Sequence, residues 1–545
     1  MSFVPKSSQA FVNGAITFVI WFAIIIFALF VLDGRRRFIY CSWRHPIANI
    51  KNIIGNVFRI LAAILSVVLL STYVIGLGTP GSGTYKWAKD NGYEPQLWNA
   101  IGDAQANNPA TTFLSLSKVK AMDKPDNYSQ KTMQSLAKKY AQEAQAINQT
   151  RSGELTDNTV IMILSETFSD PTRVPGVSFS LDPIPNIRNI KNTTTSGLML
   201  SPGYGGGTAN IEYQALTGLN LANFNDSLIV PYQQLVPSQN NLLLQPDLDG
   251  KVREECFHCG ASVPAKHVLR NINYRKFGFS YLYTLDSKVP LEHTGCIDRS
   301  PYVSDSEAYQ SILDLLDKQQ DSNSSQFLQL VTMQNHMPYG DYYDNNEFSD
   351  ADISEDLSDG ERWNINTYTK GINWTDQETA DFLNQLDQID KPITVIFYGD
   401  HLPGIYDTAD MDKNNKTVLH ETDYFIWSNS VSPSHDTKVN PVTAAYTSSN
   451  YFMPLAAEHM NAKVSPYLAM LTELQQEIPA MSRVIGANGG IGQGKATYLD
   501  HAGNNIKATA LSAKAKRLLK DYKLVQYDQT VGKNYLEDLD FTQVP

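Results

Sequence analysis

Three apolar stretches of the chain are each followed by side chains that bind metal ions in proteins. They are TVIMIL at 159–164, followed by Glu166; FLQLVTM at 327–333, followed by His336; and ITVIFY at 393–398, followed by Asp400 and His401. A single ending of this kind is usually a helix cap or a hydrogen-bonded surface group. Three together favour one site, because the carboxyl ends of parallel strands meet at one edge of a sheet.

A glycine-rich turn leads to a further candidate, Thr208. In SPGYGGGTANIEYQALTG at 201–218, three glycines precede the threonine and allow the backbone to bend sharply and approach a ligand. The residues after it are expected to form a helix, which would place the hydroxyl at or near a helix N-terminus. Free amides and the helix dipole favour a phosphate there. The alternative is that Thr208 only caps the helix.

The elements that would position these residues indicate an α/β domain. From about residue 156, short β-branched apolar runs alternate with helical segments, which is typical of a largely parallel sheet. We expect this domain to span 156–545, with a C-terminal subdomain. Residues 79–155 are polar and contain helical stretches, so they are expected to form a juxtamembrane connector.

The N-terminal residues 1–78 are predicted to be a membrane anchor. Two uncharged runs, about 11–32 and 60–78, are each long enough to span a bilayer. Six basic residues and one acid lie between the runs, which predicts a cytoplasmic loop and an outward-facing catalytic domain. The first run is long and is followed by Arg35–Arg37, so we expect a retained multi-pass anchor and not a cleaved signal peptide.

Charge and cysteine content exclude some classes of protein. Of the net charge of −12, residues 1–59 contribute +6, with seven basic and one acidic side chain, so the rest carries −18, which argues against nucleic acid as a partner. The spacing of Cys256 and Cys259 is zinc-like, but no second pair completes a site. A disulfide from Cys296 to one of these two cysteines is the preferred expectation.

Taken together, the motifs resemble the lipoteichoic acid synthase and phosphoglycerol transferase group of the alkaline phosphatase and sulfatase superfamily. The landmarks are S-E-T-F at 165–168, G-G-G-T-A-N-I-E-Y at 205–213, N-H-M-P-Y at 335–339, Y-G-D-H-L-P-G at 398–404 and Q-Y-D at 526–528. The resemblance implies an alkaline-phosphatase-like α/β fold, with a mainly parallel central sheet and flanking helices. It also implies an enzyme at the bacterial cell membrane, with its catalytic domain outside the cell.

The resemblance further implies one divalent ion held by Glu166, Thr208, Asp400 and His401. Oxygen ligands with one imidazole suit Mn²⁺ or Mg²⁺, with Zn²⁺ as an alternative. Thr208 would be the nucleophile that takes glycerol phosphate from phosphatidylglycerol in a ping-pong reaction. His336 would contact the phosphate or protonate the leaving group.

Two further residues are expected at the substrate. H-V-L-R-N-I-N-Y-R-K-F-G-F at 267–279 aligns Arg270 with an arginine of the group that binds the donor phosphate, although Val268 replaces a tryptophan. His258 corresponds to an upstream histidine of the group, at a longer spacing. Relatives commonly have about five membrane helices, whereas this sequence predicts two.

The acceptor and the fate of the transferred group stay open. The acceptor could be lipoteichoic acid, a glycolipid primer, or a wall polysaccharide that receives single glycerol phosphate groups. A phosphatase or phosphodiesterase would use the same metal and threonine with water. A sulfatase is disfavoured, because no cysteine begins the C-x-P-x-R segment that such an enzyme needs.

Overall fold

The computed structural model describes most of the chain. The described residues are 21, 24–27, 42, 44–79, 81–95, 100–116, 120–238, 253–258, 269–285, 287, 291–318, 325–348, 357–484 and 496–545. The chain divides into two compact units, Met1–Lys120 and Ala121–Pro545.

The first unit contains four described helices. They are α2 (Ile50–Leu77), α3 (Gly83–Asp90), α4 (Ala100–Asn107) and α5 (Pro109–Leu116). Within the described part of the chain, α2 is the one helix long and apolar enough to cross a membrane. It covers the expected run 60–78 except for Gly78, which is its C-cap, but it begins earlier, because the side chain of Asn49 accepts a hydrogen bond from the amide of Asn52 and caps the helix there. The other expected span, 11–32, lies almost wholly outside the described residues.

The second unit is built on an eight-stranded sheet. Its strands are β1 (Thr159–Ser165), β2 (Thr195–Leu200), β3 (Arg253–His258), β4 (Tyr281–Thr284), β5 (Gln326–Thr332), β6 (Ile393–Gly399), β7 (Glu421–Ser428) and β8 (Tyr446–Thr447). Their order is β4-β3-β5-β1-β6-β7-β2-β8. Neighbours are parallel except at β7, which runs antiparallel to both β6 and β2. The expected, mainly parallel central sheet is confirmed.

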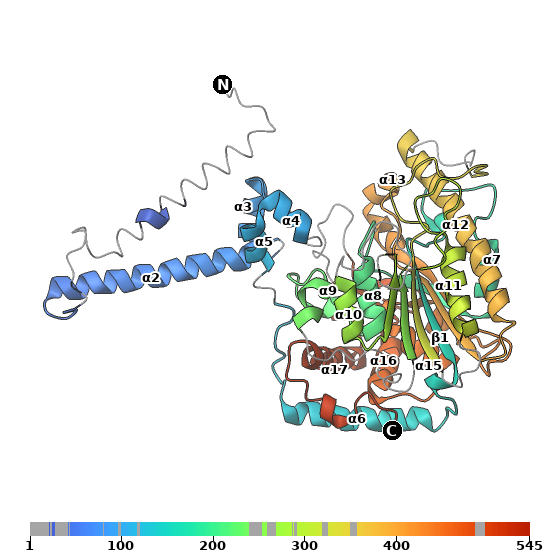
Figure 1. Ribbon diagram of the computed structural model, residues 1–545. Coiled ribbons are helices and arrows are strands. Elements are labelled where there is room, and N and C mark those ends of the chain that lie inside the picture. The colour runs from blue at the N-terminus through green and yellow to red at the C-terminus, as the bar shows by residue number, and fades with distance from the viewer. Residues whose placement is uncertain are drawn as a thin grey trace. The chain divides into compact units, whose positions relative to one another are not determined.

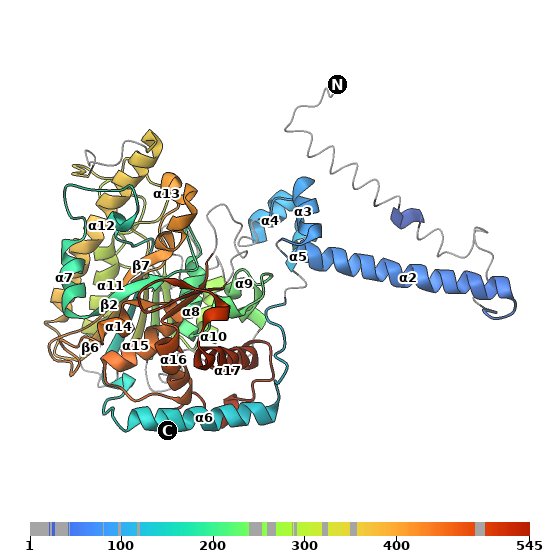
Figure 2. The ribbon, with the colours of Figure 1, turned by 180° about the vertical axis from the view of Figure 1, so that it is seen from behind.

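Helices cover both faces of this sheet (Figures 1 and 2). The described α-helices of the larger unit are α6 (Gln130–Asn148), α7 (Pro185–Thr193), α8 (Thr208–Thr217), α9 (Pro231–Gln234), α10 (Arg270–Lys276), α11 (Asp305–Lys318), α12 (Asp359–Leu386), α13 (Asp407–Met411), α14 (Pro441–Ala444), α15 (Phe452–His459), α16 (Pro466–Glu477) and α17 (Ala513–Thr530), of which α6 packs on α16 and α17. Helices α7, α11 and α12 contribute to a core cluster with β1, β5 and β6. On the opposite face, Phe452 of α15 packs on Tyr398 of β6, with ring centroids 4.6 Å apart.

A smaller antiparallel sheet follows near the C-terminus. It contains β9 (Ala480–Arg483), β10 (Ala496–Leu499) and β11 (Asn505–Ile506), in the order β11-β10-β9.

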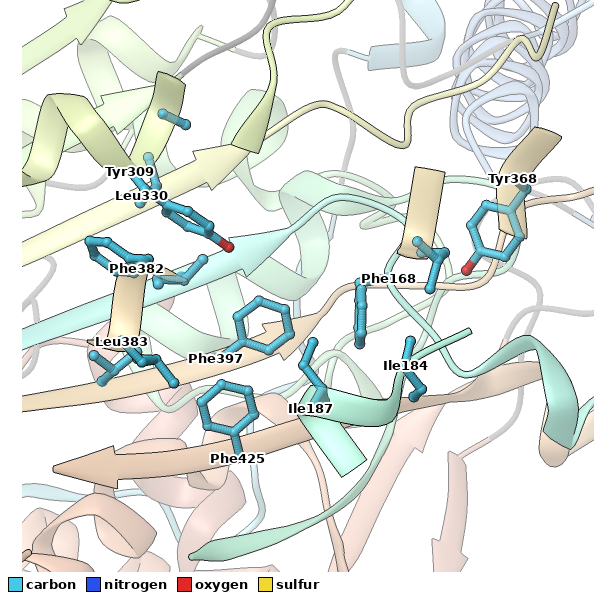
Figure 3. Packing of buried hydrophobic residues seen from close by; sticks show 14 of the residues in the cluster. Phe168, Ile184, Ile187, Tyr309, Leu330, Tyr368, Phe382, Leu383, Phe397 and Phe425 are labelled. Atoms are coloured by element: carbon cyan, nitrogen blue, oxygen red, sulfur yellow. The ribbon is translucent and has the colours of Figure 1, made fainter. Parts of the chain in front are cut away.

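An aromatic stack supports the segment that follows β1 (Figure 3). Phe168 lies edge-on to Phe397 of β6, with centroids 5.1 Å apart, and Phe397 stacks on Phe425 of β7 at 4.9 Å. All seven residues of β1 are buried, as expected for a central strand covered on both faces. The stack therefore fixes the chain immediately beyond β1 against two neighbouring strands.

Helix α6 belongs to the larger unit. Its Tyr140 hydroxyl and Lys139 ammonium both donate to Asp521 of α17, at 2.9 Å. The larger unit begins at Ala121, whereas the sequence suggested a connector extending to residue 155. The difference arises because the apolar face of α6 is buried against α16 and α17.

Candidate metal centre and nucleophile

Glu166, Asp400 and His401 converge beyond the ends of two adjacent strands. Strands β1 and β6 are parallel neighbours, with Ser165 opposite Gly399, so the residues that follow them emerge side by side. One ligand atom from each of the three side chains lies within 4.8 Å of the others, and all three residues are buried. The structure thus brings together three of the residues that the sequence suggested as metal ligands.

Hydrogen bonds orient Asp400 and His401 for a cation. Oδ1 of Asp400 accepts from the amides of Thr167, at 2.7 Å, and His401, at 2.8 Å. Its Oδ2 is buried and has no hydrogen-bond partner among the residues that the structure describes. The imidazole Nδ1 of His401 lies 2.9 Å from the carbonyl of Leu402, to which it donates, so Nε2 keeps its lone pair. A free carboxylate oxygen and an imidazole lone pair therefore face the same small space.

The cluster contains two buried carboxyl groups, and a bound cation would offset their negative charge. Nε2 of His401 lies 3.3 Å from Oδ2 of Asp400 and 3.6 Å from Oε1 of Glu166. Burial and the nearby charge of Asp400 raise the pKa of Glu166 to about 8. A buried cation would favour the ionised form of both carboxyl groups. These donors fit a divalent metal ion.

Thr208 joins the cluster from the start of α8. Its Oγ1 donates to Oε2 of Glu166 at 3.0 Å and lies 3.5 Å from Nε2 of His401. The cap position is held by Gly207 at φ 106°, a left-handed conformation that glycine adopts without strain. Thr208 is the first residue inside the helix, so the alternative that it serves only as the cap is excluded.

His336 lies beside the cluster without joining it. Its Nε2 is 4.0 Å from Oε1 of Glu166, and its side chain is partly exposed. The ring of Tyr302 packs against it, with centroids 5.6 Å apart. Its Nδ1 is hydrogen-bonded to the carbonyl of Met337, so Nε2 is the ring nitrogen that faces Glu166.

Arg270 is the first residue of α10 and is buried. Its Nε and Nη2 donate to Oε2 of Glu212 at 3.1 and 2.8 Å. The charges of Arg270 and Glu166 are close enough that each shifts the pKa of the other. The arginine therefore lies near the cluster, although its contact with phosphate stays a prediction.

The sequence expectations for His258 and the cysteines have different outcomes. His258 is the last residue of β3, which pairs with β5. The side chain of His258 lies outside the described part of the structure. Cys296 is an exposed free thiol whose Sγ contacts the carbonyl of Thr294 in its own loop. The preferred disulfide from Cys296 is therefore wrong.

Residues 158–462 match the Sulfatase protein family. The chain belongs to this family. The Sulfatase match begins just before β1 and includes Glu166, Thr208, Asp400 and His401. The prediction of an α/β enzyme of the alkaline phosphatase and sulfatase superfamily is confirmed.

Solved structures of Sulfatase-family relatives are similar to this chain. A Streptococcus pyogenes phosphoglycerol transferase, GacH, in complex with sn-glycerol-1-phosphate is 35% identical, with a TM-score of 0.65, covering 78% of this chain and 100% of that one. The Listeria monocytogenes lipoteichoic acid synthase LtaP is 16% identical, with a TM-score of 0.45, covering 73% and 99%. The resemblance to the phosphoglycerol transferase group is confirmed by the first of these.

A curated relative from Rhizobium meliloti is named for cyclic beta-1,2-glucan modification. It is 26% identical over 392 residues, which cover 69% of this chain and 55% of that protein. The chain thus spans about half the length of this relative.

Sequence reasoning assigned no role to Glu212 or Tyr302. Glu212 stands inside the quoted motif at 205–213, four residues after Thr208, but a buried carboxylate and an exposed one look alike in sequence. Tyr302 lies in a loop with no motif at all. Its ring packs on His336 and its hydroxyl donates to the carbonyl of Met337, and these tertiary contacts place it beside the cluster.

Proposed function

We propose that this enzyme transfers glycerol phosphate from phosphatidylglycerol to a cell-envelope acceptor through a covalent intermediate on Thr208. The observation that carries the proposal is the Thr208 hydroxyl, which lies at the N-terminus of α8, 3.0 Å from Glu166 and beside two further buried metal-ligand side chains. The 35% identity to a phosphoglycerol transferase supports glycerol phosphate as the transferred group.

The metal site of the proposal consists of Glu166, Thr208, Asp400 and His401. Mn²⁺ is the preferred ion, and Mg²⁺ or Zn²⁺ would be compatible with the same donors. When bound, such an ion lowers the pKa of the Thr208 hydroxyl and neutralises charge on the phosphoryl oxygens.

The side chains of the site then divide the reaction between them. Oγ1 of Thr208 gives up its proton to solvent and attacks phosphorus, the bond from phosphorus to the diacylglycerol oxygen breaks, and His336 supplies the proton that diacylglycerol takes away. Arg270 binds the phosphoryl oxygens, with His258 as a weaker candidate for the glycerol end. In the second step an acceptor hydroxyl gives its proton to His336 and attacks phosphorus. The bond from phosphorus to Oγ1 of Thr208 breaks, and the Thr208 hydroxyl regains its proton from solvent.

The proposal places the reaction at the outer surface of a bacterial membrane. Helix α2 would anchor the chain there, together with a helix in 11–32, and would raise the effective concentration of a lipid donor. The acceptor would be lipoteichoic acid or a related envelope glycan. Decoration of a wall polysaccharide is one version of this reaction.

The test uses the full chain in nanodiscs that contain a fluorescent phosphatidylglycerol. Diacylglycerol release is measured with Mn²⁺ for the natural sequence, Thr208→Ala and Thr208→Ser. We expect Thr208→Ala to lose at least about 10³-fold in kcat, because the nucleophile is removed, and Thr208→Ser to keep measurable activity. Intact-mass analysis should find the glycerophosphoryl adduct on Thr208 in the natural sequence.

Two results would overturn the proposal. Full activity of Thr208→Ala would show that Thr208 is not the nucleophile. Preference for phosphatidylethanolamine over phosphatidylglycerol would show that phosphatidylglycerol is not the donor. Added glycan acceptors should increase turnover. Release of free glycerol phosphate at the same rate with and without them would instead indicate a phosphodiesterase.

A further inference from the structure

A carboxylate is completely buried one helical turn after Thr208. Glu212 is 0% exposed, on the helix that carries the nucleophile at its first residue. Side chains four residues apart lie on the same face of a helix. A charged group in this position needs partners, because an unpaired buried charge is strongly unfavourable.

Three buried side chains surround this carboxylate. Its Oε2 accepts two hydrogen bonds from Arg270, from Nε and Nη2. Its Oε1 accepts from the hydroxyl of Tyr232, at 3.0 Å, and from that of Tyr274. The group thus joins α8, α9 and α10, and both carboxylate oxygens are fully used.

Stability alone is a weak reason for this arrangement. Replacing a buried ion pair by apolar side chains of similar volume is often neutral or stabilising, because both charges must lose their water. Burial lowers the pKa of Arg270, and the charge of Glu212 more than offsets this and keeps the guanidinium ionised. The pair therefore maintains a positive charge where burial alone would disfavour one.

The bonds also set the direction of the guanidinium. Among the described residues, the bonds made by Arg270 use Nε and Nη2 on one oxygen of Glu212, and Nη1 takes no part in them. The charge of Arg270 also acts on Glu166 in the metal-binding cluster. One helix thus carries Thr208 at its first residue and, four residues later, the carboxylate that binds Arg270.

We propose that Glu212 is a positioning residue, which holds the Arg270 guanidinium in register with the Thr208 hydroxyl to receive the phosphoryl group under attack. This inference rests on the proposed function. Thr208 lies on α8, and Arg270 is bound to α8 through Glu212. A movement of α8 therefore moves the nucleophile and the phosphate-binding group together. A misplacement of about 1 Å at a reacting centre lowers rates by about 10²-fold.

A double-mutant cycle separates positioning from a structural role. The variants are Glu212→Gln, Arg270→Ala and the two combined, with Asp521→Asn as a matched control, since Asp521 likewise accepts from a cation and a tyrosine hydroxyl. Each is made in the full chain. The readouts are Mn²⁺-dependent binding of inorganic phosphate by calorimetry, kcat and KM for phosphatidylglycerol, and the thermal shift with Mn²⁺ alone.

We expect Glu212→Gln to weaken phosphate binding and lower kcat by about 10- to 100-fold, with an unchanged Mn²⁺ shift. In the Arg270→Ala background the same substitution should change phosphate binding and kcat by less than about 3-fold, because its effect acts through Arg270. Asp521→Asn should leave phosphate binding and kcat unaltered.

If Glu212→Gln weakens phosphate binding equally in the natural and the Arg270→Ala backgrounds, the inference is overturned. It is also overturned if Glu212→Gln lowers the melting temperature and leaves phosphate binding unchanged. The phosphate cycle does not depend on the lipid. If the natural sequence fails to cleave phosphatidylglycerol but the cycle behaves as expected, the donor is wrong and the role of Glu212 stands.

Discussion

Replacing Asp400 by asparagine should make the protein more stable without metal and less responsive to metal. Asparagine keeps the oxygen that accepts from the amides of Thr167 and His401, and it puts an amide in place of the unpartnered Oδ2. The substitution removes one negative charge from a buried cluster whose repulsion raises the pKa of Glu166. The same substitution deletes an anionic metal ligand.

The expected sizes follow from linkage. At a Mn²⁺ concentration of about 100 times Kd, the native state gains about 2.7 kcal/mol. If Asp400→Asn weakens binding about 100-fold, the gain at the same concentration falls to about 0.4 kcal/mol. For roughly 425 residues in the larger unit, the entropy of unfolding is about 0.9 kcal/mol/K. The Mn²⁺ shift should therefore drop from about 3 K to under about 1 K, while the metal-free variant melts about 1 K higher.

Differential scanning calorimetry of the full chain, with chelator and with Mn²⁺, measures both changes. Asp521→Asn serves as the control, since it removes a carboxylate far from the cluster in sequence and bonded to α6. An Asp400→Asn variant that keeps the full Mn²⁺ shift would refute the ligand assignment. A metal-free variant that melts several kelvin lower would refute the claim that charge repulsion dominates the empty cluster.

Three other substitutions test the surroundings of the site. His336→Gln should lower kcat by about 10²-fold or more, as for a lost general acid, and leave the Mn²⁺ melting shift intact; loss of the shift would make His336 a ligand. Gly399→Ala would place a Cβ 1.7 Å from the carbonyl oxygen of Phe168. The free energy of unfolding, measured in urea, should therefore fall by about 3 kcal/mol or more. Gly360→Ala, with open space around it, should leave the free energy of unfolding nearly unchanged. Burial and the charge of Asp305 raise the pKa of Glu378 to about 8. The folded state therefore binds the proton of Glu378 more tightly than the unfolded chain does. The protonated carboxyl group contributes its full stability below about pH 4.5, and this stability is lost as the pH rises to about 8. Glu378→Gln should accordingly flatten the fall in unfolding free energy between pH 5 and 8.5, and an unchanged slope would contradict the shift.

The convergence of Glu166, Asp400 and His401 was predictable because these residues follow directly after strands that are local in sequence. Each buried strand is a short apolar run, and the residue that follows it emerges at the carboxyl edge regardless of the order of strands. That rule is sufficient to assign Glu166, Asp400 and His401 to one edge of the sheet. The three glycines likewise placed Thr208 at the start of a helix.

The order of the sheet was not predictable in the same way. β2 lies between β7 and β8, more than 200 residues further along the chain, and β7 reverses the direction of the sheet. Strand pairing depends on side-chain packing between distant segments, which an apolar run does not encode on its own. The burial of α6 against α16 and α17 was not predictable for the same reason, because it depends on packing between segments that are far apart in the sequence.

The sequence by itself determined the α/β class and indicated the candidate ligands and the candidate nucleophile, because these follow from residue identity and local pattern. The tertiary structure alone decided which charges meet. It paired Arg270 with Glu212 and not with solvent, left Oδ2 of Asp400 without a partner, and kept His336 just outside the cluster. The physical reason is that burial and distance set electrostatic energies, and both arise only when segments far apart in sequence pack together.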